Sequence, residues 1–278
     1  MRITIGQSTS TGPVHEAHIA TGGVVWNDSD DGVVLIHGAG MDGSVWQLQS
    51  RYLAAKGFRV AAVDLPAHGA SGGKPPASIA TMADWVALVI TTTGIGPAHI
   101  VGHSMGTFIG LDLAARHPDT VRSLALLGTA SEMPVHPALL DAATNDLAQA
   151  AQMMTGWSLS KPVVTGRNPT PGFSMAGQSL TVIEKSNPGV LRQDLDLCAT
   201  HNPMEAVEAV ADSTIAATVM TGSADKMTPA RSGRKVAHAL GVDPDHLTEL
   251  EGVGHMMMIQ DPGAVRSYLL DWLNRQRS

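Results

Sequence analysis

Short apolar runs recur along the chain and alternate with longer segments that have helical spacing. The runs fall at residues 33–36, 60–63, 99–101, 124–127, 218–220 and 247–250. Because they are apolar on both faces, they are typical of buried parallel strands. Helices are expected between them, at residues 79–93, 104–117, 228–241 and 262–275. The alternation predicts an α/β fold, in which a mostly parallel sheet carries helices on both faces.

Residues 131–205 interrupt this alternation. The segment holds prolines at seven positions and no clear strand run. It is predicted to consist of helices joined by irregular loops and inserted between two strands, and we call it the cap. The predicted organisation is therefore a core in two parts, residues 1–130 and 206–278, with the cap at residues 131–205 between them. The alternative is a surface insertion with no role in the chemistry.

The composition narrows the class of protein. The 278 residues carry 18 Lys and Arg against 25 Asp and Glu, a net charge of -7, and no basic cluster, which argues against nucleic-acid binding. A hydrophobic fraction of 44% with 15% charged residues is enough for a sizeable core and excludes disorder for most of the chain. No signal-peptide core or membrane-spanning run is present in the sequence, so a cytoplasmic protein is expected, with no membrane partner.

The candidate nucleophile is Ser104. Residues 102–106 (GHSMG) match the pattern G-x-S-x-G, between an apolar strand and a helix, which is the context that this motif requires. Residues 69–73 (GASGG) match as well, but Lys74 and two prolines follow, so no helix can begin there. Ser71 is therefore interpreted as a loop residue. In the first match, the glycines at both ends remove side chains that would collide in a sharp turn.

A serine that attacks a carbonyl group needs two N–H donors for the oxyanion. The backbone N–H of Met105, directly after the nucleophile, is one candidate. The other is expected in the glycine-rich bend that follows the first strand, residues 37–40 (HGAG), at the N–H of Ala39. By itself such a bend is only a tight turn, and it matches no nucleotide-binding glycine pattern.

The nucleophile also needs a base, and the base needs an acid. His255 and Asp225 each follow a predicted strand, at the sheet edge where active sites of α/β proteins gather. Asp225 could instead cap the helix that begins near Pro229. The histidines beside glycines, His37 and His68, are interpreted as loop scaffolding, and no metal site or cofactor is expected.

In chain order the candidates run Ser104, Asp225, His255, and with the motifs around them the chain resembles the α/β-hydrolase superfamily. The supporting motifs are residues 37–40, 64–71 (DLPAHGAS), 102–106, 222–225 (GSAD) and 254–255 (GH). The chain looks most like small capped esterases, enol-lactone hydrolases, C–C bond hydrolases and perhydrolases. The resemblance implies that Ser104 is the nucleophile, His255 the base and Asp225 the acid, with Ala39 and Met105 forming the oxyanion hole.

Two positions depart from the family pattern. Ala67 stands where the loop usually has glycine, and Thr107 where a further glycine is common. Neither position belongs to the triad, but both leave room for an altered turn or loop packing.

The substrate is expected to be a small molecule with a mainly apolar acyl or alkyl group. The cap is rich in methionine, which fills irregular apolar pockets, although ordinary core packing explains these residues equally well. Candidate substrate contacts are Trp46, His103, Trp157 and Met256. The predicted function is hydrolysis of a carboxylic ester, thioester or lactone. C–C hydrolysis, perhydrolysis, a cofactor-free lyase or oxygenase, and a non-catalytic receptor are the alternatives.

Overall fold

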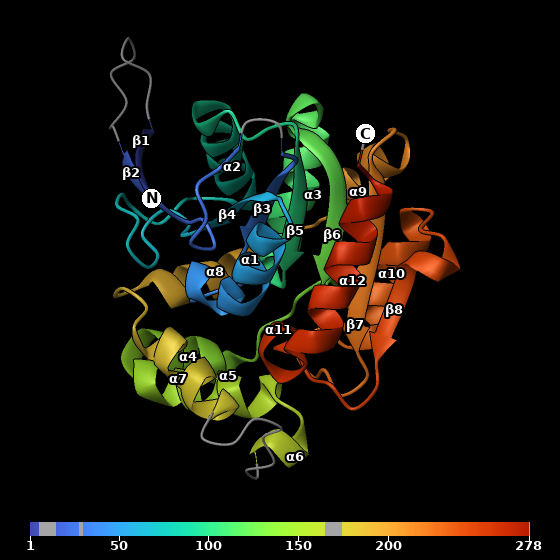
Figure 1. Ribbon diagram of the computed structural model, residues 1–278. Coiled ribbons are helices and arrows are strands. Elements are labelled where there is room, and N and C mark those ends of the chain that lie inside the picture. The colour runs from blue at the N-terminus through green and yellow to red at the C-terminus, as the bar shows by residue number, and fades with distance from the viewer. Residues whose placement is uncertain (6–14, 28–29, 165–173, 278) are drawn as a thin grey trace.

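A single mixed sheet organises the molecule (Figure 1). The computed structural model describes residues 1–5, 15–27, 30–164 and 174–277. Within these ranges the strand order is β1-β2-β4-β3-β5-β6-β7-β8. The strands are β1 (Arg2–Ile5), β2 (His15–Ala20), β3 (Gly32–Ile36), β4 (Arg59–Val63), β5 (Ala98–His103), β6 (Val121–Leu127), β7 (Ala216–Gly222) and β8 (Leu247–Leu250). Strand β2 pairs antiparallel with β1 and β4, and all other pairs are parallel.

All six predicted apolar runs are strands, and they form the parallel part of the sheet. Strands β1 and β2 were not predicted. They lie at one edge, and in β2 the exposed Glu16 alternates with the buried Ala17 and Ile19. Such a short, half-polar strand is defined by its pairing with a neighbour more than by its own sequence.

The predicted helices are present with nearly the predicted bounds. Helix α2 begins after Ser78, whose hydroxyl accepts the N–H of Thr81, and it ends at Gly94 with φ 65°. The helices are α1 (Gln47–Ala55), α2 (Ile79–Thr93), α3 (Met105–Arg116), α4 (Pro137–Asn145), α5 (Leu147–Ser158), α6 (Lys161–Val164), α7 (Met175–Glu184), α8 (Val190–Thr200), α9 (Met204–Ala211), α10 (Ala230–Ala239), α11 (Met257–Gln260) and α12 (Pro262–Arg275). Single 3-10 turns lie at Gly43–Trp46, Pro118–Thr120 and Pro244–His246.

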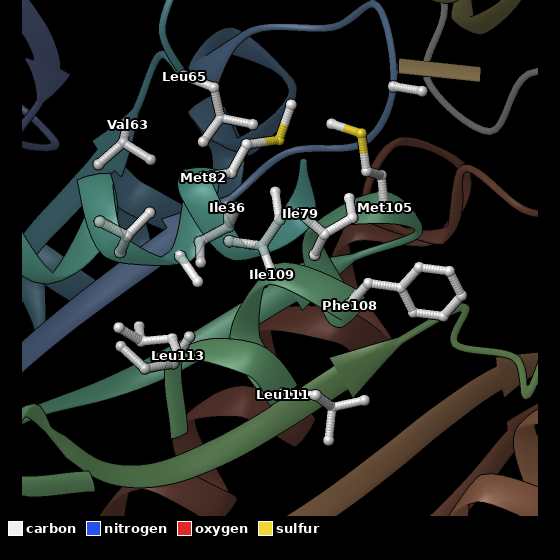
Figure 2. Packing of buried hydrophobic residues seen from close by; sticks show 14 of the residues in the cluster. Ile36, Val63, Leu65, Ile79, Met82, Met105, Phe108, Ile109, Leu111 and Leu113 are labelled. Atoms are coloured by element: carbon white, nitrogen blue, oxygen red, sulfur yellow. The ribbon is translucent and has the colours of Figure 1, made fainter. Parts of the chain in front are cut away.

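Both faces of the sheet are buried, as the apolar runs predict. In β3, Val34 and Ile36 belong to one cluster, together with helices α2, α3, α9 and α10. Val33 and Leu35 point the other way, to a cluster with α1, α11 and α12. Figure 2 shows the first cluster, where Phe108 and its neighbours on α3 pack beside Ile36. Each fully buried aliphatic side chain of this kind contributes about 1.5–3 kcal/mol to the free energy of unfolding.

A helical insertion lies between β6 and β7, where the alternation of strands and helices breaks in the sequence. Helices α4 to α8 make up its described part, and residues 165–173, inside the predicted cap, lie outside the described residues. In Figure 1, α4, α5 and α7 gather beyond the end of the sheet to which the parallel strands point. Helix α9 packs instead on α3. The insertion therefore stands over the edge where the candidate residues follow their strands.

Candidate active site

Ser104 occupies a strained turn between β5 and α3. Its backbone has φ 54° and ψ -122°, a conformation that residues other than glycine rarely adopt. A Cβ on Gly102 would lie 2.3 Å from the carbonyl oxygen of Gly106, and one on Gly106 would lie 2.5 Å from that of Ile36. Both glycines of the motif are therefore required sterically, and they let the turn press against β3.

His255 and Asp225 meet as a buried pair at the ends of β8 and β7. His255 Nδ1 lies 2.8 Å from Asp225 Oδ2, and the two side chains are 1% and 0% exposed. His255 Nε2, on the opposite edge of the ring, is buried and has no hydrogen-bond partner among the described residues. Ser104 and His255 line the same cavity, and among the described residues no hydrogen bond joins the Ser104 hydroxyl to this nitrogen. Bonds of this kind often tighten only when substrate binds.

The Asp225 carboxylate accepts hydrogen bonds from Met227 and Thr228 in addition to its contact with His255. Its Oδ1 accepts the backbone N–H groups of Met227 and Thr228 at 2.8 and 2.9 Å, and its Oδ2 accepts the Thr228 hydroxyl at 2.8 Å. Burial alone raises the pKa of the Asp225 carboxyl, but the neighbouring His255 and the bonds from Thr228 outweigh it and keep the pKa below its ordinary value. Asp225 therefore remains a carboxylate that orients the imidazole and can stabilise its charged form. Its bonds go to residues that precede α10, and this helix has no side-chain N-cap bond, so the alternative role as its cap is not observed.

Two further residues shape the space around the imidazole. Gly128 ends β6 with φ 63°, and a Cβ there would lie 3.4 Å from His255 Nδ1 and Cε1. His103 lies against His255 with ring centroids 4.6 Å apart, and its Nε2 donates to the His255 carbonyl at 2.9 Å. Burial, with His255 nearby, lowers the pKa of His103 to about 3, so this ring stays neutral.

The bend after β3 lies against the nucleophile. A Cβ on Gly38 would lie 3.1 Å from Ser104 Cβ. In the described part of the chain no hydrogen bond occupies the backbone N–H of Ala39 or of Met105, whereas the next one, on Gly40, donates to Asp194. Both N–H groups are therefore available for an oxyanion, as the resemblance implies.

The cavity above Ser104 has a volume of about 360 Å³, within the range of small-molecule sites. Ala39, Ser104, Thr228 and His255 form its floor, and Lys226 contributes the one ammonium group among its lining residues. The side chains from the insertion are mainly apolar: Met133, Leu139, Met154, Trp157, Leu195 and Cys198.

Of the four candidate substrate contacts, one lines the cavity and three do not. Trp157 lines the cavity. Trp46, His103 and Met256 are each 0% exposed and do not line it. Trp46 packs edge-on against His103, with ring centroids 6.4 Å apart, and His103 in turn packs against the His255 ring. The sequence indicates that these three residues lie near the site, but only the structure shows that they do not line the cavity.

A second serine and histidine are also in contact. His99 Nδ1 lies 2.8 Å from the Ser123 hydroxyl, and both residues are almost fully buried between β5 and β6. His99 is the second residue of β5, so this pair sits at the end of the strand opposite to Ser104 and lines no part of the cavity. Burial lowers the pKa of His99 to about 4. The contact therefore satisfies polar groups inside the sheet.

His37 and the second serine motif have structural hydrogen bonds. Ser71 donates to the Asp64 carbonyl at 2.6 Å and accepts the His18 N–H, which confirms that it is a loop residue. His37 donates to the Gly38 carbonyl and accepts the Leu65 N–H. Ala67, at the family's usual glycine position, has φ 66°, so it carries the strain that glycine would avoid.

Among the described residues, no group of three or more His, Cys, Asp or Glu side chains could hold a metal ion. None of the helices in the described ranges is long and apolar enough to cross a bilayer.

A sequence profile described as "alpha/beta hydrolase fold" matches residues 32–177, more than half of the chain. The chain belongs to the α/β hydrolase fold family. This agrees with the sheet, the strained serine and the order of the candidate residues. RutD of Pantoea ananatis is 27% identical to this α/β hydrolase over 264 residues, which is 91% of each chain.

Stronger identity to other relatives is confined to part of the chain. The pimeloyl-[acyl-carrier protein] methyl ester esterase of Chromobacterium violaceum is 43% identical over 97 residues, 35% of this chain and 36% of that protein. The (E)-2-((N-methylformamido)methylene)succinate hydrolase of Acinetobacter baylyi is 36% identical over 96 residues and is likewise matched over 36% of its length. The α/β hydrolase therefore spans about a third of the length of these two relatives.

Solved structures extend the likeness in fold to the whole chain. An esterase from Thermogutta terrifontis superposes with a TM-score of 0.82 at 21% identity and covers 100% of both chains. The enol-lactonase from Burkholderia xenovorans gives 0.80 at 23% identity, covering 94% of this chain and 97% of its own. A bromoperoxidase from Bacillus anthracis gives 0.81 at 15%, covering 99% and 100%. At these identities the likeness is one of fold.

Proposed function

We propose that this α/β hydrolase cleaves a carboxylic ester, thioester or lactone through an acyl-enzyme on Ser104. The observation that carries the proposal is the arrangement of three side chains. A strained serine and the free Nε2 of His255 face one cavity, and the other edge of the same ring is held by Asp225 at 2.8 Å. A base oriented by a carboxylate is what a serine hydroxyl needs to become a nucleophile.

In the proposed first step, the Ser104 oxygen bonds to the substrate carbonyl carbon and its proton passes to His255 Nε2. The carbonyl oxygen becomes an oxyanion, which the N–H groups of Ala39 and Met105 stabilise. The carbon then releases the alcohol or thiol, which takes the proton from His255. In a second round a water molecule, deprotonated by His255, attacks the acyl-enzyme and frees the acid and the serine.

The cavity supports a substrate with a mainly apolar body. The insertion contributes methionines, leucines and Trp157 to its wall, and we propose that the cap, residues 131–205, closes the site over the core parts at 1–130 and 206–278. Lys226 lines the same cavity and forms no ion pair within the described ranges. An anionic group at the far end of the substrate would therefore be favoured over a cationic one. The similarity to a methyl ester esterase and, in fold, to an enol-lactonase supports this class of carbonyl substrate.

The experiment that tests the proposal is Ser104→Ala, assayed with p-nitrophenyl esters of graded chain length. We expect kcat to fall by about 10⁴- to 10⁶-fold while the fold is retained. A fluorophosphonate should label the wild-type protein and not the variant. Ser123→Ala, which removes the other serine in contact with a histidine, is the matched control and should keep both activity and labelling.

The same assays separate the alternatives. Activity on β-diketones without activity on esters would indicate C–C hydrolysis, and peroxide-dependent turnover would indicate perhydrolysis. A well-folded wild-type protein that takes up no fluorophosphonate would contradict the proposal and favour a receptor.

A further inference from the structure

A second buried carboxylate approaches the site from the insertion. Asp194, on α8, is 0% exposed, and its Oδ2 accepts the backbone N–H of Gly40 at 2.8 Å. Gly40 directly follows Ala39, which lines the cavity. The bond joins residues 154 positions apart and links the insertion to the bend after β3.

The same oxygen is paired with a histidine of the core. His68 Nε2 lies 2.8 Å from Asp194 Oδ2, and His68 Nδ1 lies 2.9 Å from the Pro66 carbonyl. Because a carbonyl and a carboxylate oxygen can only accept, both ring nitrogens must carry a proton, and His68 is an imidazolium. Burial by itself lowers the pKa of His68, but the charge of Asp194 and its hydrogen bond prevail, so the pKa is raised.

The ionisation of the other titratable groups around this pair is consistent with one positive charge, which is on His68. The His37 ring lies 4.9 Å from that of His68, but its pKa is lowered to about 4 by burial, so it stays neutral. Asp64 adds a second favourable charge for His68. The thiol of Cys198, also on α8, is buried near Asp194, and burial raises its pKa, so it stays protonated.

Helix α8 contacts Gly40 at a second point. Gly40 has φ 65°, and a Cβ there would lie 2.6 Å from Leu191 Cδ1. Leu191 and Asp194 are three residues apart and therefore share one face of the helix. The side chain of one packs on Gly40 while that of the other accepts its N–H, so the position of Gly40 is set by α8.

We propose that Asp194 is a positioning residue for the oxyanion hole: by holding the Gly40 N–H it orients the neighbouring Ala39 N–H, and it makes a competent hole depend on docking of α8. The inference rests on the proposed function, because it assigns a role within that reaction. Asp194 does not touch the substrate. Its carboxylate is kept in place by His68, so the two residues act as a unit.

The test compares Asp194→Asn with the wild type in ester hydrolysis. The amide oxygen can still accept the Gly40 N–H, but it is a weaker acceptor and no longer balances the His68 charge, so the bend after β3 is held less firmly. Since displacing or removing an oxyanion donor costs about 10²-fold or more, we expect kcat to fall by about 10- to 100-fold. KM should stay within about threefold, because the interaction acts in the transition state.

A control and a second readout separate positioning from folding. Asp196→Asn alters the same helix, where Asp196 is 42% exposed and pairs with Arg192 at 2.8 Å, and it should leave both kcat and KM within about twofold. Affinity for a trifluoromethyl ketone, which forms an oxyanion on Ser104, should fall in Asp194→Asn by the same factor as kcat/KM. Affinity for the product acid should not change.

If the Asp194→Asn variant fails to fold, the double variant His68→Met with Asp194→Leu tests the proposal in its place. Apolar replacement of a buried ion pair is often neutral or stabilising, so this variant should fold, and unlike Asp194→Asn it has no side-chain acceptor for the Gly40 N–H. Unchanged kcat in either folded variant, or a raised KM with unchanged kcat, would overturn the proposal. These results can be distinguished from failure of the proposed function, because in that case the Ser104→Ala variant would remain active.

Discussion

Within the described ranges, two fully buried histidine–carboxylate pairs have the same separation and opposite properties. In both His255–Asp225 and His68–Asp194, the nitrogen and oxygen lie 2.8 Å apart and the side chains are at most 1% exposed. They differ at the second ring nitrogen. That of His255 faces the cavity without a hydrogen bond among the described residues, whereas that of His68 donates to the Pro66 carbonyl.

This difference shows what makes a histidine available for proton transfer. Both nitrogens of His68 are occupied by acceptors, so its proton is kept and the ring serves as a fixed cation. His255 has one ring nitrogen held by Asp225 and one without a hydrogen bond among the described residues, which is the arrangement that the proposed proton exchange with Ser104 requires. A short contact with a carboxylate is therefore insufficient to identify a base, and the environment of the opposite edge decides.

Among changes to the two histidine–carboxylate pairs and their surroundings, the largest expected effect comes from Asp225→Asn. The amide cannot hold the imidazole in the tautomer that leaves Nε2 free, so kcat should fall by about 10⁴-fold with little change in KM. Steady-state kinetics on an activated ester measures this. A loss as small as that expected for Asp194→Asn would mean that the two pairs do not differ in the way described.

Gly128→Ala tests the space around the active imidazole. The new methyl group would lie 3.3 Å from the Thr228 hydroxyl and 3.4 Å from the His255 ring, on a backbone with φ 63°. Backbone strain there should lower the free energy of unfolding by about 1–2 kcal/mol, and kcat should fall about tenfold as the ring shifts. Urea denaturation and kinetics measure the two effects. Gly57→Ala is the control, because it has a similar φ of 81° with no atom within 4 Å of the new Cβ, and it should lose stability without losing activity.

The pH dependence of the free energy of unfolding should show that His68 is the charged histidine of the two pairs. Its pKa is raised from the ordinary 6.5, so the pair with Asp194 contributes fully below that pH and loses its contribution as pH rises through the folded-state pKa. The free energy of unfolding should therefore decline on the alkaline side of neutrality. The double variant His68→Met with Asp194→Leu should show a flatter profile over that range, and an equal slope in both proteins would contradict the assignment.

Lys226→Met should give the smallest effect. Lys226 is exposed at the cavity, so its attraction for an anionic substrate is about 0.5–1 kcal/mol, which corresponds to a two- to fivefold change. The ratio of kcat/KM for a monoester of a dicarboxylic acid to that of a neutral ester of equal length should fall by this factor. High salt should reduce the wild-type ratio in the same direction.

The central strands, most core helices and the location of the site could be predicted from local pattern. Apolar runs such as residues 33–36 must be buried on both faces. The glycines around Ser104 predict a sharp turn that few other residues permit. The edge strands β1 and β2 could not be predicted in this way, because His15–Ala20 is half polar and its register comes from pairing with Arg2–Ile5 and Arg59–Val63.

The same limit applies within the site. Asp225 and His255 could be found because each follows a strand at the edge where parallel strands end. Thr228, three residues after Asp225, carries a signal only as part of a helix start, although its hydroxyl contacts both side chains of the pair. Asp194 lies 126 residues from His68 in a region without sequence periodicity, and no local pattern marks it.

The sequence by itself determined the sheet, the strained serine turn and the order of the residues that follow the strands, because apolar periodicity and glycine sterics act over a few neighbouring positions. Only the tertiary structure decided which histidine keeps a free nitrogen, which tryptophan faces the cavity, and that a carboxylate from α8 holds Gly40. These depend on contacts between segments more than a hundred residues apart, whose geometry is set by packing of the whole core.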